Sequence, residues 1–211
     1  MSPVVVNTWG SLVDSVISLV SSLESGTGLL DGVSATGLTS ADLRNIILAI
    51  VEHESGGNPA AEGDQNATGG FNSVGLMQIN WAAHGSDPNL LMIEQLPGGA
   101  IHYVRITSRD ELFDPATNLT AGLRIFLGQL KKFEDVSLAI LGYNGPADAA
   151  HYHADPTWVP PNISYLSDVL DILGETFQSA TKQFPSIVPV MGLLLVGTGI
   201  VLWKNHRQKV K

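Results

Sequence analysis

Residues 46–80 have the sequence IILAIVEHESGGNPAAEGDQNATGGFNSVGLMQIN, in which an apolar helical pattern gives way to a turn-rich loop. We predict a helix over 41–54, because apolar residues recur at helical spacing on one face: Leu43, Ile46, Ile47, Ile50 and Val51. Gly56 and Pro59 end this helix. A loop rich in Gly, Asn and Asp then covers 56–73, so the last turn of the helix lies beside an irregular segment.

Glu54 occupies that last turn. A carboxyl group at the end of an apolar helix is partly desolvated, which raises its pKa and keeps a proton available near neutral pH. A general acid that protonates a glycosidic oxygen needs this property. Glu52 points to another face of the helix, where we expect water to solvate it. A lone Glu at a helix end is usually surface charge, so the case for Glu54 depends on its neighbours.

Four sequence blocks follow one another from Glu54 onward: ESGGNPAA (54–61), SVGLMQIN (73–80), DPATNLTAGLRIFL (114–127) and AILGYNGP (139–146). This ordered set resembles the catalytic domain of lytic transglycosylases of the soluble (SLT) type, which are relatives of goose-type lysozyme. YLSDVL (165–170) resembles the closing Tyr-Val helix of that family. The resemblance covers about residues 38–172.

The resemblance implies a lysozyme-like fold that is mainly α-helical. Helical patterns over 117–132, 135–143 and 164–184 agree with this, and strand signals are sparse. A Pro-rich loop is predicted over 145–161. We therefore expect one SLT-like domain over 38–184.

By resemblance, Glu54 is the catalytic acid and base, and Ser55 adjoins it in the same motif. Gly75 allows the backbone to approach the sugar closely. Met77 and Gln78 are expected to line the cleft, although core packing is the alternative for Met77.

Two further residues come from the last block of the resemblance. Tyr143 is expected to hold Glu54 through its hydroxyl, and Asn144 to bind the N-acetyl region of the sugar. Asp114, Pro115 and Asn118 are better interpreted as the start of a helix with its cap, without a catalytic role.

In the SLT family one Glu protonates the oxygen that links N-acetylmuramic acid to N-acetylglucosamine and then deprotonates the muramyl 6-hydroxyl, which gives a 1,6-anhydro product without water. The usual hydrolytic scheme needs two carboxylates, and no second acid lies inside the matched motifs. Glu62 and Asp64 lie in the neighbouring loop and could approach Glu54. A peptidoglycan hydrolase (lysozyme) therefore remains an alternative. A non-catalytic structural wall-binding protein is another, which the intact Glu54, Gln78 and Tyr143 disfavour.

The charge balance bears on possible partners. The chain has 11 Lys and Arg against 20 Asp and Glu, a formal net charge of −9, and residues 1–203 carry only 7 of the basic residues. Because residues 1–203 are this acidic, they repel the phosphate backbone of nucleic acids, and we expect no nucleic-acid partner. The absence of Cys excludes disulfides, Zn-thiolate sites and thiol nucleophiles. We predict no metal and no organic cofactor, and we interpret His151 and His153 as surface residues.

Residues 187–203 form a charge-free run, IVPVMGLLLVGTGIVLW, with KNHRQKVK after it. A helix of 17 residues spans about 26 Å, close to the thickness of a bilayer core. We predict a transmembrane helix over 185–203 and a basic tail over 204–211 on the inner side of the membrane. A buried core helix is the alternative.

Residues 1–37 are predicted to form an amphipathic helix and a flexible Gly/Ser/Thr-rich linker over 25–37. This helix either docks on the domain or lies on a membrane surface. Because a transmembrane helix is predicted over 185–203, we expect a single-pass membrane protein whose catalytic domain faces the cell wall. The membrane of a bacteriophage particle is favoured over the bacterial inner membrane as its location.

Overall fold

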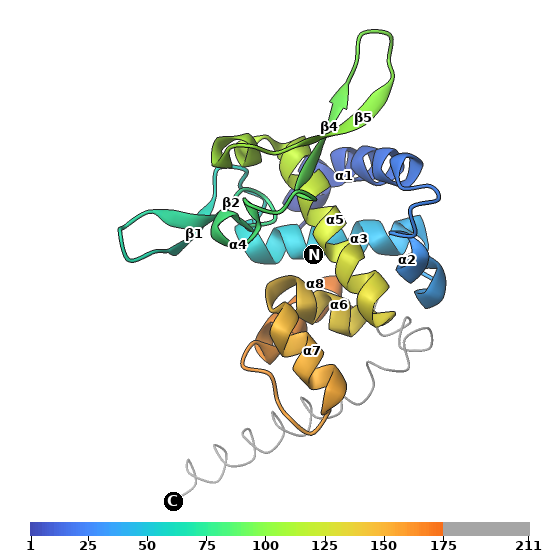
Figure 1. Ribbon diagram of the computed structural model, residues 1–211. Coiled ribbons are helices and arrows are strands. Elements are labelled where there is room, and N and C mark those ends of the chain that lie inside the picture. The colour runs from blue at the N-terminus through green and yellow to red at the C-terminus, as the bar shows by residue number, and fades with distance from the viewer. Residues whose placement is uncertain (175–211) are drawn as a thin grey trace, which may run out of the picture.

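A computed structural model describes residues 1–174 of the chain (Figure 1). Within this part, helices dominate and surround a single apolar core, so the prediction of a mainly α-helical fold is confirmed. The predicted transmembrane helix and basic tail (185–211) lie outside the described residues.

Helix α3 (Ser40–Ser55) is the central helix of the fold. Thr39 and Asp42 form a reciprocal capping box at its start, and Gly56 ends it in the left-handed conformation with φ 60°. Six consecutive residues, Ile46–Val51, are buried, so the helix has neighbours on all sides along its middle. The prediction of a helix over 41–54 is confirmed.

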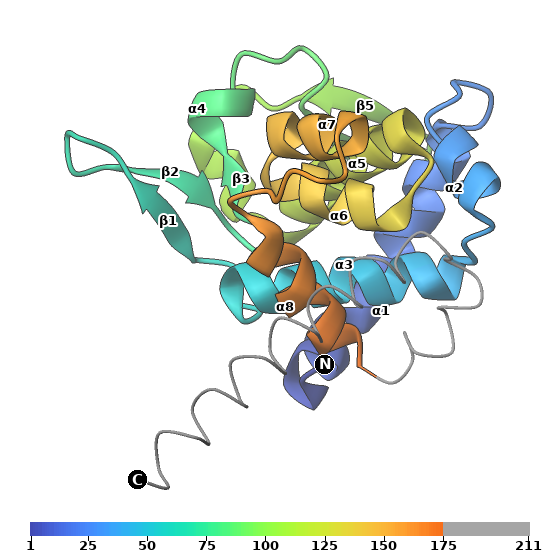
Figure 2. The ribbon, with the colours of Figure 1, turned by 90° about the horizontal axis from the view of Figure 1, so that it is seen from below.

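Three later helices complete the core: α5 (Pro115–Phe133), α6 (Val136–Asn144) and α8 (Ile163–Leu173). Helix α8 packs against α3 and α6, and α6 packs against α5. Asp114 caps α5 by accepting from the Thr117 N–H at 2.8 Å, and Asp135 caps α6 in the same way. Seen from below, α8 lies across α3 (Figure 2). The predicted helices over 117–132 and 135–143 are confirmed, and α8 accounts for the described part of the one predicted over 164–184.

Helix α7 (Pro146–Ala154) follows α6 with a single residue between them. It occupies most of the segment that the sequence predicted to be a Pro-rich loop, so that prediction is wrong for 146–154. Pro146 stands at the first helical position, where its missing N–H costs nothing, and therefore starts the helix instead of breaking it.

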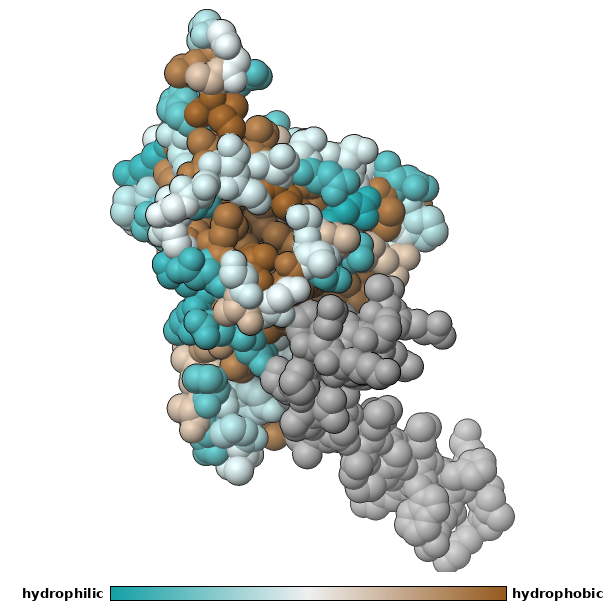
Figure 3. Space-filling model, turned by 90° about the vertical axis from the view of Figure 1, so that its right-hand side faces the viewer, coloured by the Kyte–Doolittle hydropathy of each residue, from teal (hydrophilic) through white to brown (hydrophobic). Residues whose placement is uncertain are grey.

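Two small antiparallel sheets extend from the helical body. One has the order β1 (Glu62–Gln65), β2 (Phe71–Val74), β3 (Ile79–Asn80), and α4 (Trp81–His84) follows it. The other pairs β4 (Leu91–Gln95) with β5 (Ile101–Arg105). Both hairpins project from the helices in Figure 1. Figure 3 shows apolar side chains along the β4–β5 hairpin at the top of the molecule.

The N-terminal segment belongs to the folded body. One face of α1 (Pro3–Leu23) is buried in the core through Val5, Val13, Val16, Ile17 and Val20. The expected flexible linker instead contains α2 (Asp31–Thr36), which packs against α5. Among the described helices, α1 alone has the length and apolar composition of a membrane span, as buried helices of globular proteins also can.

A buried ion pair joins this N-terminal helix to the rest. Glu24, which ends α1, pairs with Arg124 of α5, and their side chains are 6% and 14% exposed. The Arg124 guanidinium lies 4.3 Å from the centre of the Tyr103 ring on β5. Burial lowers the pKa of Arg124 and raises that of Tyr103 to about 12. Three elements distant in sequence therefore meet at one desolvated cation.

Candidate active site

A cavity of about 490 Å³ opens where α3, α6, α4 and the β1–β2 hairpin meet. Its lining combines ionisable, amide and apolar side chains: Glu54, Asp64, Ser73, Gln78, Ile79, Asn80, Ala83, His84, Ile125, Tyr143, Asn144 and Pro146. A concave site of this size with a few convergent polar groups is suited to bind part of a larger ligand.

Glu54 projects into this cavity from the last turn of α3. Its pKa is raised from 4.5 to about 7 as the net result of three effects: burial raises the pKa, the Tyr165 hydroxyl lowers it, and the nearby charge of Asp64 raises it. Desolvation is the largest of these effects, because a carboxylate loses its hydration on leaving water. A large share of Glu54 side chains therefore carries a proton near neutral pH.

Tyr165 is the neighbour that favours the charged form of Glu54. It lies on α8, is 5% exposed, and its ring meets the His53 ring edge-on at 4.7 Å. Within residues 1–174 its hydroxyl makes no hydrogen bond of normal geometry, so it remains available to the Glu54 carboxyl group. The sequence marked Tyr165 only as the start of a family-like helix and gave no sign of this proximity.

Tyr143 comes from α6 and also lines the cavity. Its hydroxyl donates to the Met77 carbonyl at 2.8 Å, and burial together with the charge of Glu54 raises its pKa well above the usual value. This geometry differs from the expectation that the Tyr143 hydroxyl holds Glu54. The α6 tyrosine instead supports the backbone turn before Gln78, and the α8 tyrosine interacts with Glu54.

Gln78 lines the cavity in a left-handed conformation, with φ 46°. Its side-chain NH₂ group donates to the carbonyls of Ala61 and Gly75, at 3.1 and 2.9 Å. Both amide donors are therefore used inside the protein. Only the Oε1 atom of Gln78 is left to accept a bond from a ligand.

Asn144 ends α6 at the cavity wall. Its Oδ1 atom accepts from Asn162 at 3.0 Å, so its NH₂ group is the part available to a ligand carbonyl. This arrangement fits the acetamido-binding role that the resemblance implies for Asn144.

The family model of the transglycosylase SLT domain matches residues 33–154, more than half of the chain. The chain belongs to the SLT transglycosylase family. No curated protein and no solved structure matches it significantly. Family membership supports an enzyme of the peptidoglycan lytic transglycosylase type, with peptidoglycan as its substrate.

Three predicted site residues of this SLT domain do not line the cavity: Ser55, Gly75 and Met77. Met77 is fully buried and packs against Gly122 of α5, so its side chain belongs to the core. The Ser55 hydroxyl donates to the Leu76 carbonyl at 2.8 Å and ties the end of α3 to this turn. Gly75 has φ 78°, and a Cβ there would collide with Asn118 and the Leu112 carbonyl. These residues shape the turn that presents Gln78.

Asn118 holds that turn from α5. It is completely buried, accepts from the Met77 N–H at 2.8 Å, and donates to the carbonyls of Val74 and Leu112 at 2.8 and 2.9 Å. A single amide thus satisfies three backbone groups that the core hides from water. Asn118 therefore has a structural role, although it holds this turn, whereas Asp114 caps the helix.

Asp64 is the second carboxylate at the cavity and stands at its exposed rim on β1. It accepts from the Ser73 hydroxyl and, at 3.4 Å, from Asn80. Glu62, the other acid considered from sequence, is not part of the lining and pairs with Arg109. Of these two loop acids, the SLT domain brings only Asp64 to Glu54.

The cavity lining also includes residues that the sequence did not single out. His84 ends α4, and burial lowers its pKa, so its ring is neutral at pH 7. Ile79 and Ile125 supply apolar surface to the same lining. A wall of this kind can pack against the less polar face of a sugar ring.

Residues 1–174 contain no cluster of three or more His, Asp or Glu side chains arranged to hold a metal ion. His151 and His153 lie on α7, where His151 stacks on Trp158 at 4.0 Å and His153 meets Phe133 edge-on at 5.7 Å. Aromatic packing gives these two histidines a local role in the structure.

Proposed function

We propose that this protein is a lytic transglycosylase that cleaves the β-1,4 linkage between N-acetylmuramic acid and N-acetylglucosamine in peptidoglycan, with Glu54 as its catalytic acid and base. The observation that carries the proposal is the raised pKa of Glu54, about 7, at the wall of a glycan-sized cavity. Family membership supplies the substrate class.

In the first step, the protonated Glu54 carboxyl group gives its proton to the glycosidic oxygen while the bond from that oxygen to muramyl C1 breaks. Charge develops on the carboxylate as the proton leaves. The Tyr165 hydroxyl favours this charged form, because it lowers the pKa of Glu54. The Glu54 carboxylate then serves as the base in the second step.

In the second step, the muramyl C6 hydroxyl oxygen bonds to C1, and its proton goes to the Glu54 carboxylate. The products are a 1,6-anhydromuramyl end and a free 4-hydroxyl on N-acetylglucosamine, and the enzyme regains its proton. No water is consumed. Attack from within the same sugar has a large entropic advantage over attack by a separate nucleophile.

The remaining predicted residues assist this reaction by binding and shaping. The Asn144 NH₂ group binds the acetamido carbonyl, and Gln78 accepts from a sugar hydroxyl through Oε1. Ser55, Gly75 and Met77 act through the backbone turn they stabilise, and Tyr143 fixes the same turn at the Met77 carbonyl.

Hydrolysis is the second candidate, and the position of Asp64 favours it. Asp64 lines the same cavity as Glu54, and its charge acts on Glu54. A carboxylate in that position could activate a water molecule, as a two-carboxylate glycosidase requires. The product would then carry a reducing muramyl end.

The deciding experiment uses purified peptidoglycan, the full-length protein and its Glu54→Gln variant, with mass spectrometry of the released muropeptides. The proposal expects 1,6-anhydromuramyl ends with the wild type and none with the variant. Reducing ends would establish hydrolysis, and the Asp64→Asn variant would then test the second carboxylate. Binding of peptidoglycan without release would show a structural wall-binding protein.

We also propose that residues 187–203 anchor the enzyme in a membrane with the catalytic domain toward the wall. The charge-free run and the basic residues after it support this. A membrane-containing bacteriophage particle is the location we favour, where such an enzyme would open the wall locally during genome entry. The full chain should stay with the membrane fraction after alkaline extraction and a variant lacking 187–203 should be released. Absence from purified particles would contradict the phage location.

A further inference from the structure

The β1–β2 hairpin forms one wall of the active-site cavity. Asp64 on β1 and Ser73 on β2 both line it, and the Ser73 hydroxyl donates to the Asp64 carboxylate. The rest of the hairpin projects away from the helices (Figure 1). Its position therefore decides where Asp64 stands relative to Glu54.

The backbone of this wall is strained at Asp64. In a regular strand, residues two apart share a face, which would place Glu62 and Asp64 on the same side of β1. Asp64 instead has φ 55°, a left-handed conformation that is unfavourable for a residue with a side chain. The two carboxylates accordingly meet different partners. Such strain persists only where surrounding contacts hold it.

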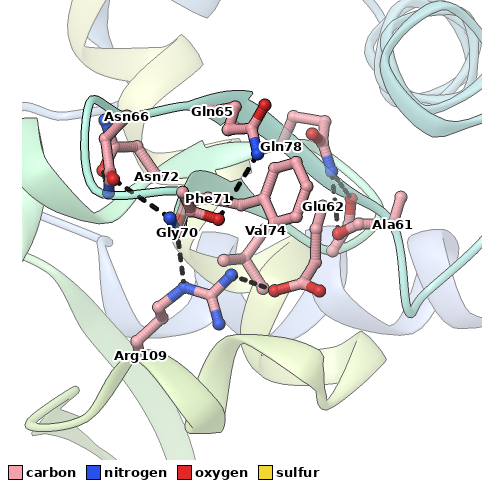
Figure 4. A network of polar contacts seen from close by, with 12 residues as sticks. Ala61, Glu62, Gln65, Asn66, Gly70, Phe71, Asn72, Val74, Gln78 and Arg109 are labelled. Carbon is pink, nitrogen blue, oxygen red and sulfur yellow. Dashed lines mark hydrogen bonds and ion pairs between the residues drawn. The ribbon is translucent and has the colours of Figure 1, made fainter.

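Arg109 supplies contacts of this kind from outside the hairpin. It begins the short 3₁₀ helix η1 (Arg109–Phe113) and reaches both strands. Its guanidinium pairs with the Glu62 carboxylate on β1, and its Nε–H donates to the Phe71 carbonyl on β2 at 3.2 Å (Figure 4). The Phe113 ring lies under the same guanidinium, 5.3 Å from its centre.

We infer that Arg109 is a positioning residue of the active site, which fastens the β1–β2 hairpin to η1 and so sets the place of Asp64 opposite Glu54. Arg109 does not itself line the cavity. The inference rests on the proposed function, since it concerns catalysis at the Glu54 cavity. It holds whether the site forms 1,6-anhydromuramyl ends or reducing muramyl ends.

The test compares Arg109→Ala with Arg44→Ala in the full-length protein. Arg44 forms an ion pair with Asp14 at 3.1 Å on another part of the surface, and both arginine side chains are 26% exposed. Each variant therefore loses one ion-paired guanidinium of the same exposure. We expect kcat on peptidoglycan to fall about 10-fold for Arg109→Ala and to stay unchanged for Arg44→Ala. Arg109→Lys, which keeps the charge, should recover part of the loss.

The pH profile separates positioning from direct electrostatics. The ionisable groups that act on Glu54 or are acted on by it are Asp64 from β1, Tyr143 from α6 and Tyr165 from α8, and His84 from α4 lines the same cavity. Removing the positive charge of Arg109 would by itself raise the pKa of Glu54. Release of the hairpin instead moves Asp64 away and admits water, and both changes lower the pKa of Glu54. We expect the basic limb of the profile to shift to lower pH.

Two further measurements complete the test. Hydrogen exchange of the 62–74 amides should speed up in Arg109→Ala and not in Arg44→Ala. The double variant Arg109→Ala/Asp64→Asn should be no slower than Asp64→Asn alone, because Arg109 acts through Asp64. The inference would be overturned if the kcat losses of the two single variants multiply in the double variant. A basic limb that moves to higher pH in Arg109→Ala, or unchanged hydrogen exchange of the 62–74 amides, would also overturn it. Failure of the proposed function is distinct, because the wild type would then release no muropeptides while the exchange comparison still tests the fastening.

Discussion

The helical floor of the cavity and its hairpin wall are stabilised by different forces. Glu54, Tyr143 and Tyr165 come from three helices that pack around one apolar core. Asp64 comes from a hairpin whose contacts to the body include an exposed ion pair and backbone hydrogen bonds. The proposed proton-transferring group, Glu54, is thus fixed by burial, whereas the Asp64 carboxylate near it is fixed by polar contacts. The catalytic rate should therefore be more sensitive to changes in the helical floor (Glu54, Tyr143 and Tyr165) than to changes in the hairpin wall that carries Asp64.

The largest effect is expected for Glu54→Gln. The amide keeps the size of the side chain but can neither give nor take the proton, so muropeptide release should fall by about 10³-fold or more. The matched wall variant, Asp64→Asn, should retain measurable release of anhydro ends. Equal losses in the two variants, measured by quantifying muropeptides, would remove the distinction between floor and wall and favour the two-carboxylate mechanism.

Stability should divide in the same way between two asparagines. Asn118→Ala removes three hydrogen bonds to buried backbone groups and should lower the free energy of unfolding by about 3 kcal/mol. Asn66 also makes several bonds, but at the hairpin tip, where its Oδ1 accepts from Thr68 and Gly70. Asn66→Ala should cost less than about 1 kcal/mol, because water replaces its bonds. Urea denaturation followed by circular dichroism measures both. A larger cost for Asn66 would contradict the contrast.

Burial of Glu54 also predicts a pH dependence of stability. Its pKa is about 7 in the folded protein against 4.5 as the ordinary value, so the folded state binds more protons between these values. Stability from this group is present below pH 4.5 and is lost as pH rises through 7, by about 3 kcal/mol. Glu54→Gln should abolish that decline, and the variant should melt above the wild type at pH 8. A melting difference independent of pH would show that Glu54 is hydrated in the folded protein.

The smallest effect separates the two tyrosines of the floor. Tyr165→Phe removes the group that favours the charged form of Glu54, so the basic limb of the pH–rate profile should move to higher pH and kcat should fall about 10-fold. Tyr143→Phe loses the bond to the Met77 carbonyl and should cost about 1 kcal/mol of stability, without that shift of the limb. A shift in Tyr143→Phe alone would restore the role first expected for Tyr143.

The same division explains what the sequence could predict. Helices α3, α5 and α6 follow from apolar spacing and from caps such as Asp114, because their signals are local. The β1 and β2 strands, EGDQ and FNSV, lack apolar alternation, since only Val74 enters the core and the other side chains are polar or lie at the surface or the cavity. The roles of Tyr143, Tyr165 and Met77 depend on which helix ends meet in space. The sequence predicted Glu54 as the catalytic residue, and it could not assign these contacts.

The buried pair of Glu24 and Arg124 has a consequence for where this enzyme can be cut. The family match begins at residue 33, yet the partner of Arg124 lies nine residues before it, and α1 fills part of the core. A fragment that starts at 33 would leave a desolvated cation without its counter-ion and an apolar groove open to water, at a cost of several kcal/mol. The smallest autonomously folding unit is therefore larger than the family match, and it includes the N-terminal helix.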